Sequence, residues 1–543
     1  MPPTPFETLM DYHEATKHHF HRYARSAGAM DWANQPNPFR VYDGADQIPL
    51  PLAPQDPEWP YDALYTVPDG EPSPLDLDGV GLFLELSLGL SAWKAAGTSR
   101  WSLRINPSSG NLHPTEGHLV LPDIPGLAGG VFHYSPLRHG LERRLHLPNG
   151  CWSQLSDHFK GPGFLAALST IFWRESWKYG ERAYRYCNLD VGHALAAISF
   201  AARLQGWKAV CLTGAGDDQI RALLGFTGRI WPPGGAEEPE LLCWIATAPR
   251  PGHDPQQLPK QWERFFLGQA FSGRPNPLSP RHVAWPIIDA AALAGEKPET
   301  TPGHPAAQGA LPAGPAPPEP VADSAATVLR RRRSAVRFDS GQSISAATFF
   351  SILSRTLFRL EAPPFSVGLG VPDVNLLLFV HRVKGLPPGL YLLGRESDVI
   401  ARYRKTWRKD LLWRPAHEAL PFWLLKRADV TNTAMEVSCH QEIAGDSAFA
   451  VAMIARFKER IASAAAAYRR LYWECGMIGQ VLYLEAEARG LRGTGIGCFF
   501  DDPVHELLGI KDHSNQSLYH FTVGHPIEDT RLATLPAYHH LER

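Results

Sequence analysis

The chain has 543 residues, too many for a single hydrophobic core, so we expect two domains, with or without a third small element. Hydrophobic residues make up 44% and charged residues 20%, an ordinary globular balance, and a net charge of −2 gives no reason to expect nucleic acid or an anionic membrane as a partner. The N-terminus lacks the basic and apolar segments of a signal peptide, and no apolar stretch is long enough to span a bilayer.

The cysteines are odd in number and include no CxxC pair, which favours reduced thiols over a disulfide framework or a zinc site. They are Cys151, Cys187, Cys211, Cys243, Cys439, Cys475 and Cys498. We therefore expect a cytoplasmic protein without a metal centre.

Residues 1–60 are expected to form an irregular N-terminal extension. The stretch from Tyr12 to Tyr23 has helical potential and is rich in histidine. Histidine ligands to a metal come with a fixed spacing and with further ligands, and neither is evident here. An exposed or partly packed helix is the alternative.

The first domain is expected over residues 61–285. Apolar residues at helical spacing predict its helices, and short apolar runs between turn residues predict its strands. The helices are predicted over 80–98, 150–175 and 189–203, and the strands over 118–121, 131–134 and 241–246. The helix over 189–203 is strongly apolar, so we expect it to be buried, with Gly206 as its C-cap.

A polar loop from Arg104 to Pro114 precedes the first of these strands. It is dense in small hydroxyl side chains, glycine and asparagine, with a proline near each end. Such a loop can bring backbone N–H groups close to an anionic or ring-shaped ligand. The same residue types dominate ordinary turns, so both interpretations stay open at this point.

A segment rich in proline, alanine and glycine, 297–320, is predicted to be a semi-extended linker, and we place the linker as a whole at 286–326. The second domain is expected over 327–543. Its predicted elements are a helix over 346–355, strands over 375–382 and 389–392, a helix-rich segment up to residue 468 and an apolar helix over 476–489.

The two apolar helices belong to an internal repeat. At one constant offset along the chain, Gly192 aligns with Gly476 and Asp217 with Asp501, without a gap. Agreement of glycines and acidic pairs at one offset indicates a duplication. Two such halves would pair as an intramolecular version of a two-fold dimer.

The two halves carry complementary motifs. A second offset, which aligns Gly126 with Gly385, places the loop residues 107–111 on residues 366–370, which have lost the loop motif. The second half also lacks the Lys178-Tyr179 pair, and the first half has nothing like the segment 332–337.

Each of three motifs has a chemical and a plain interpretation. The arginines and serine of 332–337 suit a phosphate, through bidentate guanidinium contacts and a hydroxyl donor, or form a basic surface patch. The glycines of 493–497 let backbone lie against a flat ring, or form a turn. Lys178 and Tyr179 could serve as proton-transfer groups if desolvation lowers the pKa of the lysine. The alternative is that Lys178 is an ordinary exposed residue of a helix.

Taken together, these motifs resemble a known family. R-x-N-P-S-S-G-N-L-H-P-T-E at 104–116 resembles the flavin-contacting loop of the nitroreductase superfamily and, more narrowly, of the SagB-type dehydrogenases, which include the azoline oxidases. R-R-S-A-V-R-F at 332–338 resembles the phosphate-binding start of a nitroreductase domain, and 476–510 resembles its C-terminal flavin-contacting segment. The stretch 177–194 resembles the SagB type, so the resemblance covers most of both halves.

The resemblance implies an α+β fold of two tandem nitroreductase-like domains that form an intramolecular pseudo-dimer. Each domain would have a central, mostly antiparallel sheet flanked by helices. In the family each FMN lies at a dimer interface, so the complementary halves imply one complete FMN site and one degenerate site.

The resemblance also implies which residues form the site. The phosphate would be held by Arg332, Arg333, Ser334 and Arg337, with Arg531 as a further candidate. The flavin ring would be contacted by Gly495, Ile496 and Gly497 and by the loop residues Pro107, Ser108, Ser109 and Asn111. Lys178 and Tyr179 match a Lys-Tyr pair associated with catalysis in azoline oxidases, which implies a general-base role.

The implied activity is that of an FMN-dependent oxidoreductase of the SagB type, which transfers hydride from a substrate such as a peptide-derived azoline to flavin. The N-terminus has no evident peptide-recognition domain, so a small-molecule substrate and a peptide substrate both stay open. The alternatives are an NAD(P)H-dependent nitro or quinone reductase and a flavin-free pseudoenzyme that acts as a scaffold. Neither nucleic acid nor a membrane is expected as a partner, and oligomerisation beyond the pseudo-dimer is left open.

Overall fold

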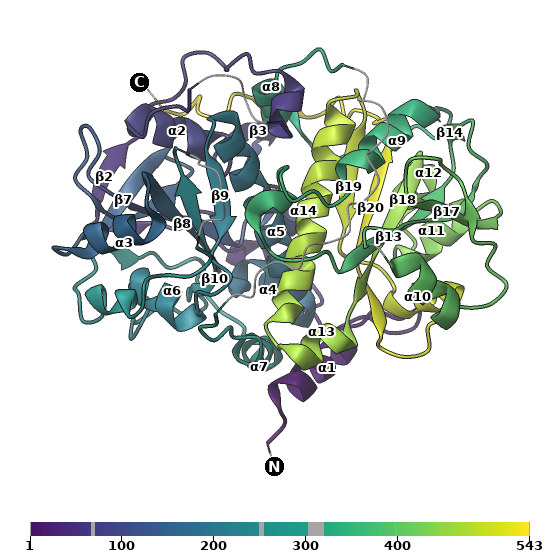
Figure 1. Ribbon diagram of the computed structural model, residues 1–543, viewed down its shortest axis with the longest axis horizontal. Coiled ribbons are helices and arrows are strands. Elements are labelled where there is room, and N and C mark those ends of the chain that lie inside the picture. The colour runs from purple at the N-terminus through teal and green to yellow at the C-terminus, as the bar shows by residue number, and fades with distance from the viewer. Residues whose placement is uncertain (1, 67–70, 249–254, 302–319, 397, 542–543) are drawn as a thin grey trace.

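Two long helices, α5 (Ala183–Leu204) and α14 (Ala467–Glu487), pass side by side through the centre of the molecule, with a seven-stranded sheet on either side (Figure 1). The structure is a computed structural model that describes residues 2–66, 71–248, 255–301, 320–396 and 398–541. Both helices are buried along most of their length, as their apolar sequences predict. Gly206 follows α5 with φ 72° and donates its N–H to Arg203 O, which confirms the predicted C-terminal glycine.

Each sheet is built from antiparallel pairs within one half of the chain. The first has the order β2-β7-β6-β5-β8-β10-β9 and the second β16-β17-β15-β13-β18-β20-β19. The first comprises β2 (Asp46–Pro49), β5 (Thr115–Leu121), β6 (Gly130–Ser135), β7 (Gly140–His146), β8 (Gly163–Thr170), β9 (Lys208–Cys211) and β10 (Glu238–Ala246). The second comprises β13 (Val374–Val380), β15 (Gly389–Leu393), β16 (Arg414–Pro415), β17 (Phe422–Arg427), β18 (Phe449–Arg456), β19 (Arg492–Ile496) and β20 (Asn515–Gly524).

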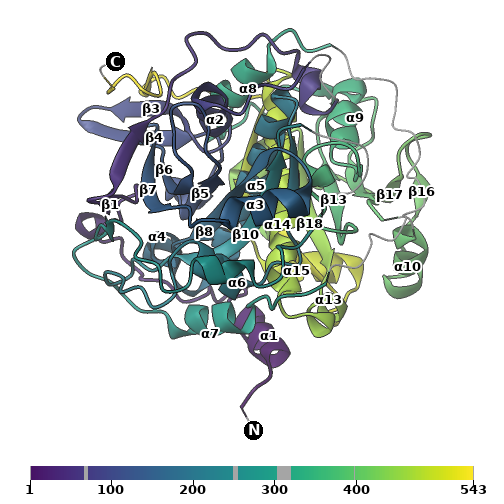
Figure 2. The same cartoon turned by 60° about the vertical axis from the view of Figure 1, so that its left-hand side comes forward.

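Shorter helices flank the two sheets (Figure 2). In the first half they are α1 (Pro5–Ala15), α2 (Leu77–Glu85), α3 (Cys151–Phe159), α4 (Phe172–Tyr179), α6 (Asp217–Leu223) and α7 (Pro286–Ala294). In the second half they are α8 (Ala325–Arg331), α9 (Ala346–Arg355), α10 (Val399–Thr406), α11 (Thr431–Val437), α12 (Glu442–Asp446), α13 (Lys458–Ser463) and α15 (Asp501–Leu508). This arrangement confirms the predicted α+β fold of two sheet-and-helix halves.

The internal repeat appears directly in the element boundaries. The first residues of α5 and α14, Ala183 and Ala467, are equivalent under the offset that aligns Gly192 with Gly476. Strands β5 and β13 likewise begin at positions that are equivalent under the second offset found in the sequence. Tyr184 and Tyr468, equivalent under the first offset, stack on each other with ring centroids 5.9 Å apart. The halves therefore meet around a pseudo-two-fold axis that passes between the central helices.

Three helix predictions are wrong over part of their length. Residues 80–98 contain α2 but continue as β3 (Leu90–Ala96), and 150–175 contain α3 and α4 with the strand β8 between them. The segment leading to residue 468 includes the strands β17 and β18. Strand β8 is buried on both faces between β5 and β10, so its apolar run carries no alternation that would distinguish it from a buried helix.

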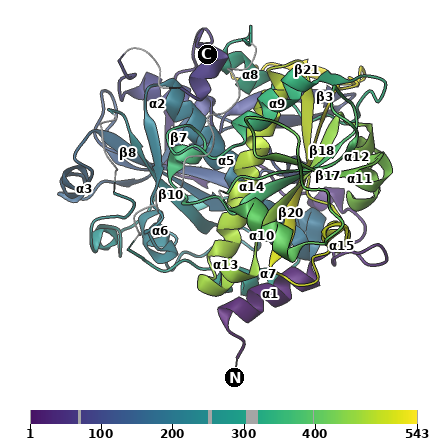
Figure 3. The same cartoon turned by 45° about the vertical axis from the view of Figure 1, so that its right-hand side comes forward.

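Both ends of the chain cross between the halves. Helix α1 ends at Ala15, earlier than predicted, and Tyr12 Oη donates to Glu181 O at 2.7 Å while His13 hydrogen-bonds Gln516 at 3.1 Å. At the other end, β21 (Ala533–Leu535) joins β3 of the first half, which also pairs with β4 (Ser99–Arg104) (Figure 3). The remaining short pairs are β1 (Tyr42–Asp43) with β11 (Arg274–Pro275), and β12 (Ile344–Ser345) with β14 (Val383–Lys384).

The predicted linker 286–326 contains α7 at its start and the beginning of α8 at its end. The centre of its proline- and alanine-rich stretch, 302–319, lies outside the described residues. Within the parts of the chain that the structure describes, no helix has both the length and the apolar character needed to cross a membrane.

Candidate functional site

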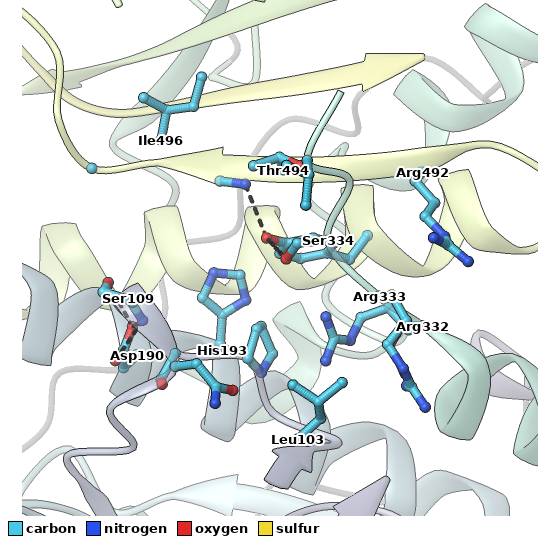
Figure 4. Close-up of a pocket in the computed structure, with 18 of the residues that line it drawn as sticks. Leu103, Ser109, Asp190, His193, Arg332, Arg333, Ser334, Arg492, Thr494 and Ile496 are labelled. Carbon is cyan, nitrogen blue, oxygen red and sulfur yellow. Dashed lines mark hydrogen bonds between the residues drawn. The ribbon is translucent and has the colours of Figure 1, made fainter. Parts of the chain in front are cut away.

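A cavity of about 490 Å³ lies between the two halves, within the size range of small-molecule and cofactor sites. The first half contributes β4, the polar loop and the start of α5, and the second half contributes the end of α8, β19 and the C-terminal tail. Figure 4 shows Arg332, Arg333 and Arg492 toward one end of this cavity and Ser109 with Asp190 toward the other.

The polar loop is held to the first half by its own side chains. Ser108 Oγ accepts from the His113 backbone N–H at 2.9 Å, and Asn111 Nδ2 donates to Ser102 O at 2.9 Å. Ser109 donates from both its backbone N and its Oγ to the Asp190 carboxylate on α5, at 3.0–3.1 Å. These bonds present the loop to the cavity in one fixed conformation.

Lys178 and Tyr179 form the C-terminal end of α4, behind the loop. Tyr179 lines the cavity, while Lys178 is half-buried beside it, with Nζ 5.1 Å from the centre of the Tyr179 ring. Gly110 makes this approach possible, because a Cβ at that position would lie 2.6 Å from Tyr179 Oη and 3.1 Å from Lys178 Nζ. Burial, reinforced by the Glu175 carboxylate, raises the pKa of Tyr179 well above its usual value.

Glu175 and Asp190 form a buried pair of carboxyl groups beneath this corner of the cavity. The side chain of Glu175 is fully buried, and its carboxyl oxygens accept no hydrogen bond from the described part of the chain. Burial and, for Glu175, the nearby Asp190 carboxylate raise the pKa of both groups well above their usual values. We infer that the pair holds a proton at neutral pH.

The opposite end of the cavity is strongly cationic. Arg332 is 4% exposed, and Arg333, Lys94 and Arg492 lie around it on the cavity wall. Burial, followed by the neighbouring Arg332, lowers the pKa of Arg333 to about 10. Arg492 is paired with Glu528 at 2.7 Å, whereas Arg333 bonds to backbone carbonyls and to Ser91.

Arg332 has an incomplete set of partners. One terminal nitrogen donates to Arg104 O at 2.9 Å, across the boundary between the halves, and the guanidinium group lies 5.0 Å from the centre of the Tyr483 ring. Its Nε meets no acceptor among the described residues. A buried guanidinium in this state is costly to desolvate, so this end of the cavity favours an anion.

Strand β19 and the start of the second half are joined at the cavity wall. Ser334 Oγ and Tyr483 Oη are 2.9 Å apart, and Tyr483 Oη accepts from Gly495 N at 2.9 Å. A Cβ on Gly495 would lie 1.8 Å from Tyr519 Oη, and one on Gly497 would lie 2.2 Å from the Tyr186 ring. Tyrosine side chains fill the space that a Cβ on either glycine would need, so these two glycines present only backbone to the cavity.

Most of the predicted site residues lie on this one cavity. Those that line it are Pro107, Ser108, Ser109, Asn111, Tyr179, Arg332, Arg333, Ser334, Gly495, Ile496 and Gly497. Lys178 lies just behind the loop. The structure does not bring Arg337 or Arg531 to the cavity: both are exposed, and Arg531 pairs with Asp529 at 2.7 Å.

Other lining residues were not predicted. They include Lys94, Arg104, Tyr186, Asp190, His193, Tyr483, Arg492, Cys498 and Tyr519. Arg492 directly precedes the glycine motif, so its position was a usable signal. His193 hydrogen-bonds Tyr519 Oη and Gln480 at 3.2 Å each, and only the tertiary structure could reveal those contacts, because they join one half of the chain to the other.

The pseudo-symmetric position in the other half has different contacts. The segment equivalent to the polar loop forms a short 3-10 turn, η6 (Phe365–Val367), that packs against β9. Gln256 Nε2 donates to Gly368 O at 2.8 Å, and the backbone carbonyl of Gln256 accepts from Gly214 N. These contacts agree with the expectation that the second site is degenerate.

Comparisons with known proteins cover both the domain and the whole chain. The Nitroreductase family model matches residues 329–525. A Methanocaldococcus jannaschii protein named as a nitroreductase is 28% identical over 122 residues, and the match spans 22% of this chain and 62% of that protein. A solved Anabaena variabilis structure named as a nitroreductase has a TM-score of 0.69 at 22% identity and covers 96% of this chain and 99% of its own. Residues 329–525 are therefore similar to the Nitroreductase family, and the chain as a whole shares the fold of the Anabaena variabilis protein.

Proposed function

We propose that the cavity binds FMN and that the protein is an FMN-dependent oxidoreductase. The similarity of residues 329–525 to the Nitroreductase family supports an oxidoreductase, and the buried Arg332 with its unpartnered Nε is the observation that carries the cofactor assignment. An anion such as the FMN phosphate would satisfy a guanidinium group whose lost hydration is otherwise only partly compensated. FMN would supply the hydride-transfer chemistry of the reaction.

The residues of the second half would hold the phosphate. Arg332 and Arg333 offer guanidinium donors, and the hydroxyl of Ser334 lies on the same wall. Arg492 and Lys94 add positive charge from β19 and from the first half. Because Arg337 and Arg531 are exposed and neither lines the cavity, we assign them no more than an accessory role.

The ring would lie toward the polar loop. Backbone from Gly495 to Gly497 would approach it on one side, and Pro107 to Asn111 would approach it from the other half. Since the loop is fixed to Asp190 and the strand to Tyr483, both walls are rigid before any ligand binds. Such preorganisation reduces the entropic cost of orienting a substrate.

Lys178 and Tyr179 would be the proton-transfer groups. Lys178 Nζ lies close to the loop at Gly110 and can take a proton from the substrate bond that is oxidised. Tyr179 Oη stays protonated because of its raised pKa and can donate a hydrogen bond beside it. The buried Glu175–Asp190 pair lies within reach as a neighbouring proton store.

We further propose that the substrate is a dihydro-heterocycle of the azoline type, oxidised as in the SagB-type enzymes that the loop and the Lys178-Tyr179 stretch resemble. The competing activity is an NAD(P)H-dependent reduction of nitro or quinone compounds. A neutral azoline needs a base for its C–H bond, whereas hydride donation by NAD(P)H needs none, and the Lys-Tyr pair favours the first.

Cofactor content tests the core of the proposal. The purified full-length protein, or the protein incubated with added FMN and desalted, should show a flavin spectrum, and acid extraction should release about one FMN per chain. Protein that stays colourless after incubation with FMN would overturn the assignment.

Substrate class is tested separately on the flavin-loaded protein. Under anaerobic conditions, bleaching of the flavin band by a thiazoline- or oxazoline-containing compound, with little bleaching by NADH or NADPH, supports azoline oxidation. The reverse pattern would replace it by the reductase activity while leaving the cofactor assignment intact.

A further inference from the structure

Two cysteines from separate segments meet at the wall of the cavity. Cys498 lines the cavity directly after Gly497, and its Sγ lies 2.9 Å from Cys439 Sγ. Cys439 lies in the turn between α11 and α12, where its φ is 56°. Both residues are half-buried, so both keep some exposure to solvent.

The backbones that carry the two sulfurs are tied together. Gln441 Nε2 donates to Ser438 O and to Cys498 O, each at 2.9 Å. Ser438 directly precedes Cys439, so this one amide group bridges the two cysteine segments. The Phe500 N–H donates to Val437 O at 2.9 Å a few residues away. Because these bonds hold both segments, the approach of the sulfurs does not depend on a single flexible side chain.

The surroundings of Cys498 favour its thiolate. Ala24 N–H donates to His18 Nδ1 at 2.9 Å, which leaves Nε2 as the hydrogen-bearing ring nitrogen, and His18 hydrogen-bonds Cys498. Arg182 donates to the neighbouring Gly497 O at 3.3 Å, although its charge is shared with Asp501. The contact with the Cys439 thiol, and after it the hydrogen bond with His18, lowers the pKa of Cys498, while the same thiol contact raises the pKa of Cys439.

A second cysteine pair shows what this environment adds. Cys211 and Cys243 face each other on β9 and β10, but they are 2% and 0% exposed inside the first half. A disulfide reagent cannot reach them without unfolding. In each pair one thiol has a lowered pKa and a cationic side chain lies nearby, Lys297 at Cys211 and Arg182 at Cys498, so access is what the Cys439–Cys498 pair adds to the requirements of a reactive dithiol.

We propose that Cys439 and Cys498 form a thiol–disulfide redox site that reduces a disulfide substrate. The Cys498 thiolate attacks one sulfur of that disulfide, which forms a mixed disulfide and releases one thiol. Cys439 then gives up its proton and attacks Cys498 Sγ, which releases the second thiol and leaves a Cys439–Cys498 disulfide. Two electrons pass from the two cysteines to the substrate disulfide, which leaves as two thiols. This site goes beyond the proposed function and does not depend on bound flavin.

The test uses the reduced full-length protein and a defined mixture of reduced and oxidised dithiothreitol. After acid quenching and alkylation, peptide mapping by mass spectrometry should find a cross-link between the peptides that contain Cys439 and Cys498. Its fraction should rise with the share of oxidised reagent and fall again with reduced reagent. Full alkylation of both cysteines at every ratio would overturn the proposal, as would an equal yield of Cys211–Cys243 cross-link.

Variants and alkylation rates sharpen this test. Cys211→Ser is the matched control and should keep the cross-link. Cys439→Ser should accumulate a mixed disulfide on Cys498 when oxidised glutathione is added, because the second sulfur is missing. In the wild-type protein, iodoacetamide at about pH 6.5 should modify Cys498 at least ~10-fold faster than Cys439, since the thiolate is the nucleophile. Equal rates in the folded protein would refute the assignment of Cys498 as the attacking thiol.

Discussion

Gly192 of α5 and Gly476 of α14 each lie against the backbone of the opposite central helix. A Cβ on Gly192 would lie 2.2 Å from Trp473 O, and a Cβ on Gly476 would lie 2.1 Å from Leu189 O. Leu189 and Trp473 are themselves equivalent under the offset that aligns the two glycines, so the two contacts are one contact repeated about the pseudo-two-fold axis. This crossing sets the distance between the halves and hence the width of the cavity.

We expect Gly192→Ala to destabilise the protein, although alanine is the better helix former. The added methyl group would overlap backbone that cannot move without separating the helices, and such overpacking costs about 1–3 kcal/mol or more, against roughly 1 kcal/mol gained in helix propensity. Urea unfolding measures the change. Gly161→Ala is the control, because a Cβ there meets nothing within 4 Å. Equal stability of the two variants would refute the close crossing.

Arg332→Met should weaken FMN binding at least ~10-fold, since a hydrogen bond to a charged group contributes about 1.5–3 kcal/mol. Methionine keeps most of the buried volume. The matched control is Arg331→Met at the neighbouring residue, which pairs with Asp323 and Glu487 outside the cavity. Titration of apoprotein with FMN, followed by fluorescence quenching, measures both. An unchanged affinity in Arg332→Met would remove this residue from the phosphate site.

Lys178→Met should leave FMN bound while slowing substrate oxidation about 10²–10⁴-fold, the range expected when a general base is lost. Tyr179→Phe should have a smaller effect on turnover, because it removes a hydrogen-bond donor and not the base. Lys511→Met, at an exposed position, serves as the control. Flavin content and single-turnover reduction rates are measured on each variant. Full activity in Lys178→Met would exclude the lysine as the base.

Glu175→Gln should become more stable than the wild-type protein as pH rises. The pKa of Glu175 is raised in the folded state, so above about pH 4.3 the folded protein holds a proton that the unfolded chain has released. Wild-type stability therefore falls with increasing pH through this group, and glutamine removes that fall. Urea unfolding of both proteins at about pH 5, 7 and 8.5 measures the difference. A difference that stays constant with pH would contradict the protonated carboxyl pair.

His133 should contribute stability that is lost at alkaline pH. It lies between Glu116 and Glu142, at 3.0 and 2.9 Å, and although burial opposes the charge, these carboxylates raise its pKa to about 9. The stability is fully present below about pH 6.5 and is lost as pH rises through about 9, with a total on the order of 3 kcal/mol. Urea unfolding as a function of pH measures this contribution. His133→Gln should lose this pH dependence, whereas His539→Gln, at an exposed position, is the control and should keep it.

The sequence was sufficient for the elements whose pattern is local. The helix Ala346–Arg355 was predicted with its observed bounds, and the repeat offsets appear unchanged in the first residues of α5 and α14 and of β5 and β13. It was not sufficient for β3 and β8. Strand β3 pairs with β21, a partner in the C-terminal tail that no local pattern reveals. Strand β8 is covered on both faces, so its apolar run lacks the alternation that marks a strand.

The residues of the candidate site likewise fall into those that local sequence patterns predicted and those that they did not. The polar loop, the arginine segment and the glycine motif were found from composition and spacing, because each is a short stretch with specific chemistry. Arg337 was grouped with Arg332 for the same reason, yet the chain turns between them and leaves Arg337 exposed. Asp190 and His193 were missed because a buried polar residue on an apolar helix acquires its role only from the partners that pack against it.

By itself, the sequence determined that this protein is a duplication with complementary halves, since internal repetition and motif loss are properties of residue order. The tertiary structure alone decided that the halves meet at the Gly192–Gly476 crossing and enclose the cavity that Arg332 lines. It also decided that Arg332 is buried with an unpartnered Nε and that Cys439 meets Cys498. Contacts between groups so far apart in the chain depend on how whole helices and sheets pack, and no local pattern of residues encodes that packing.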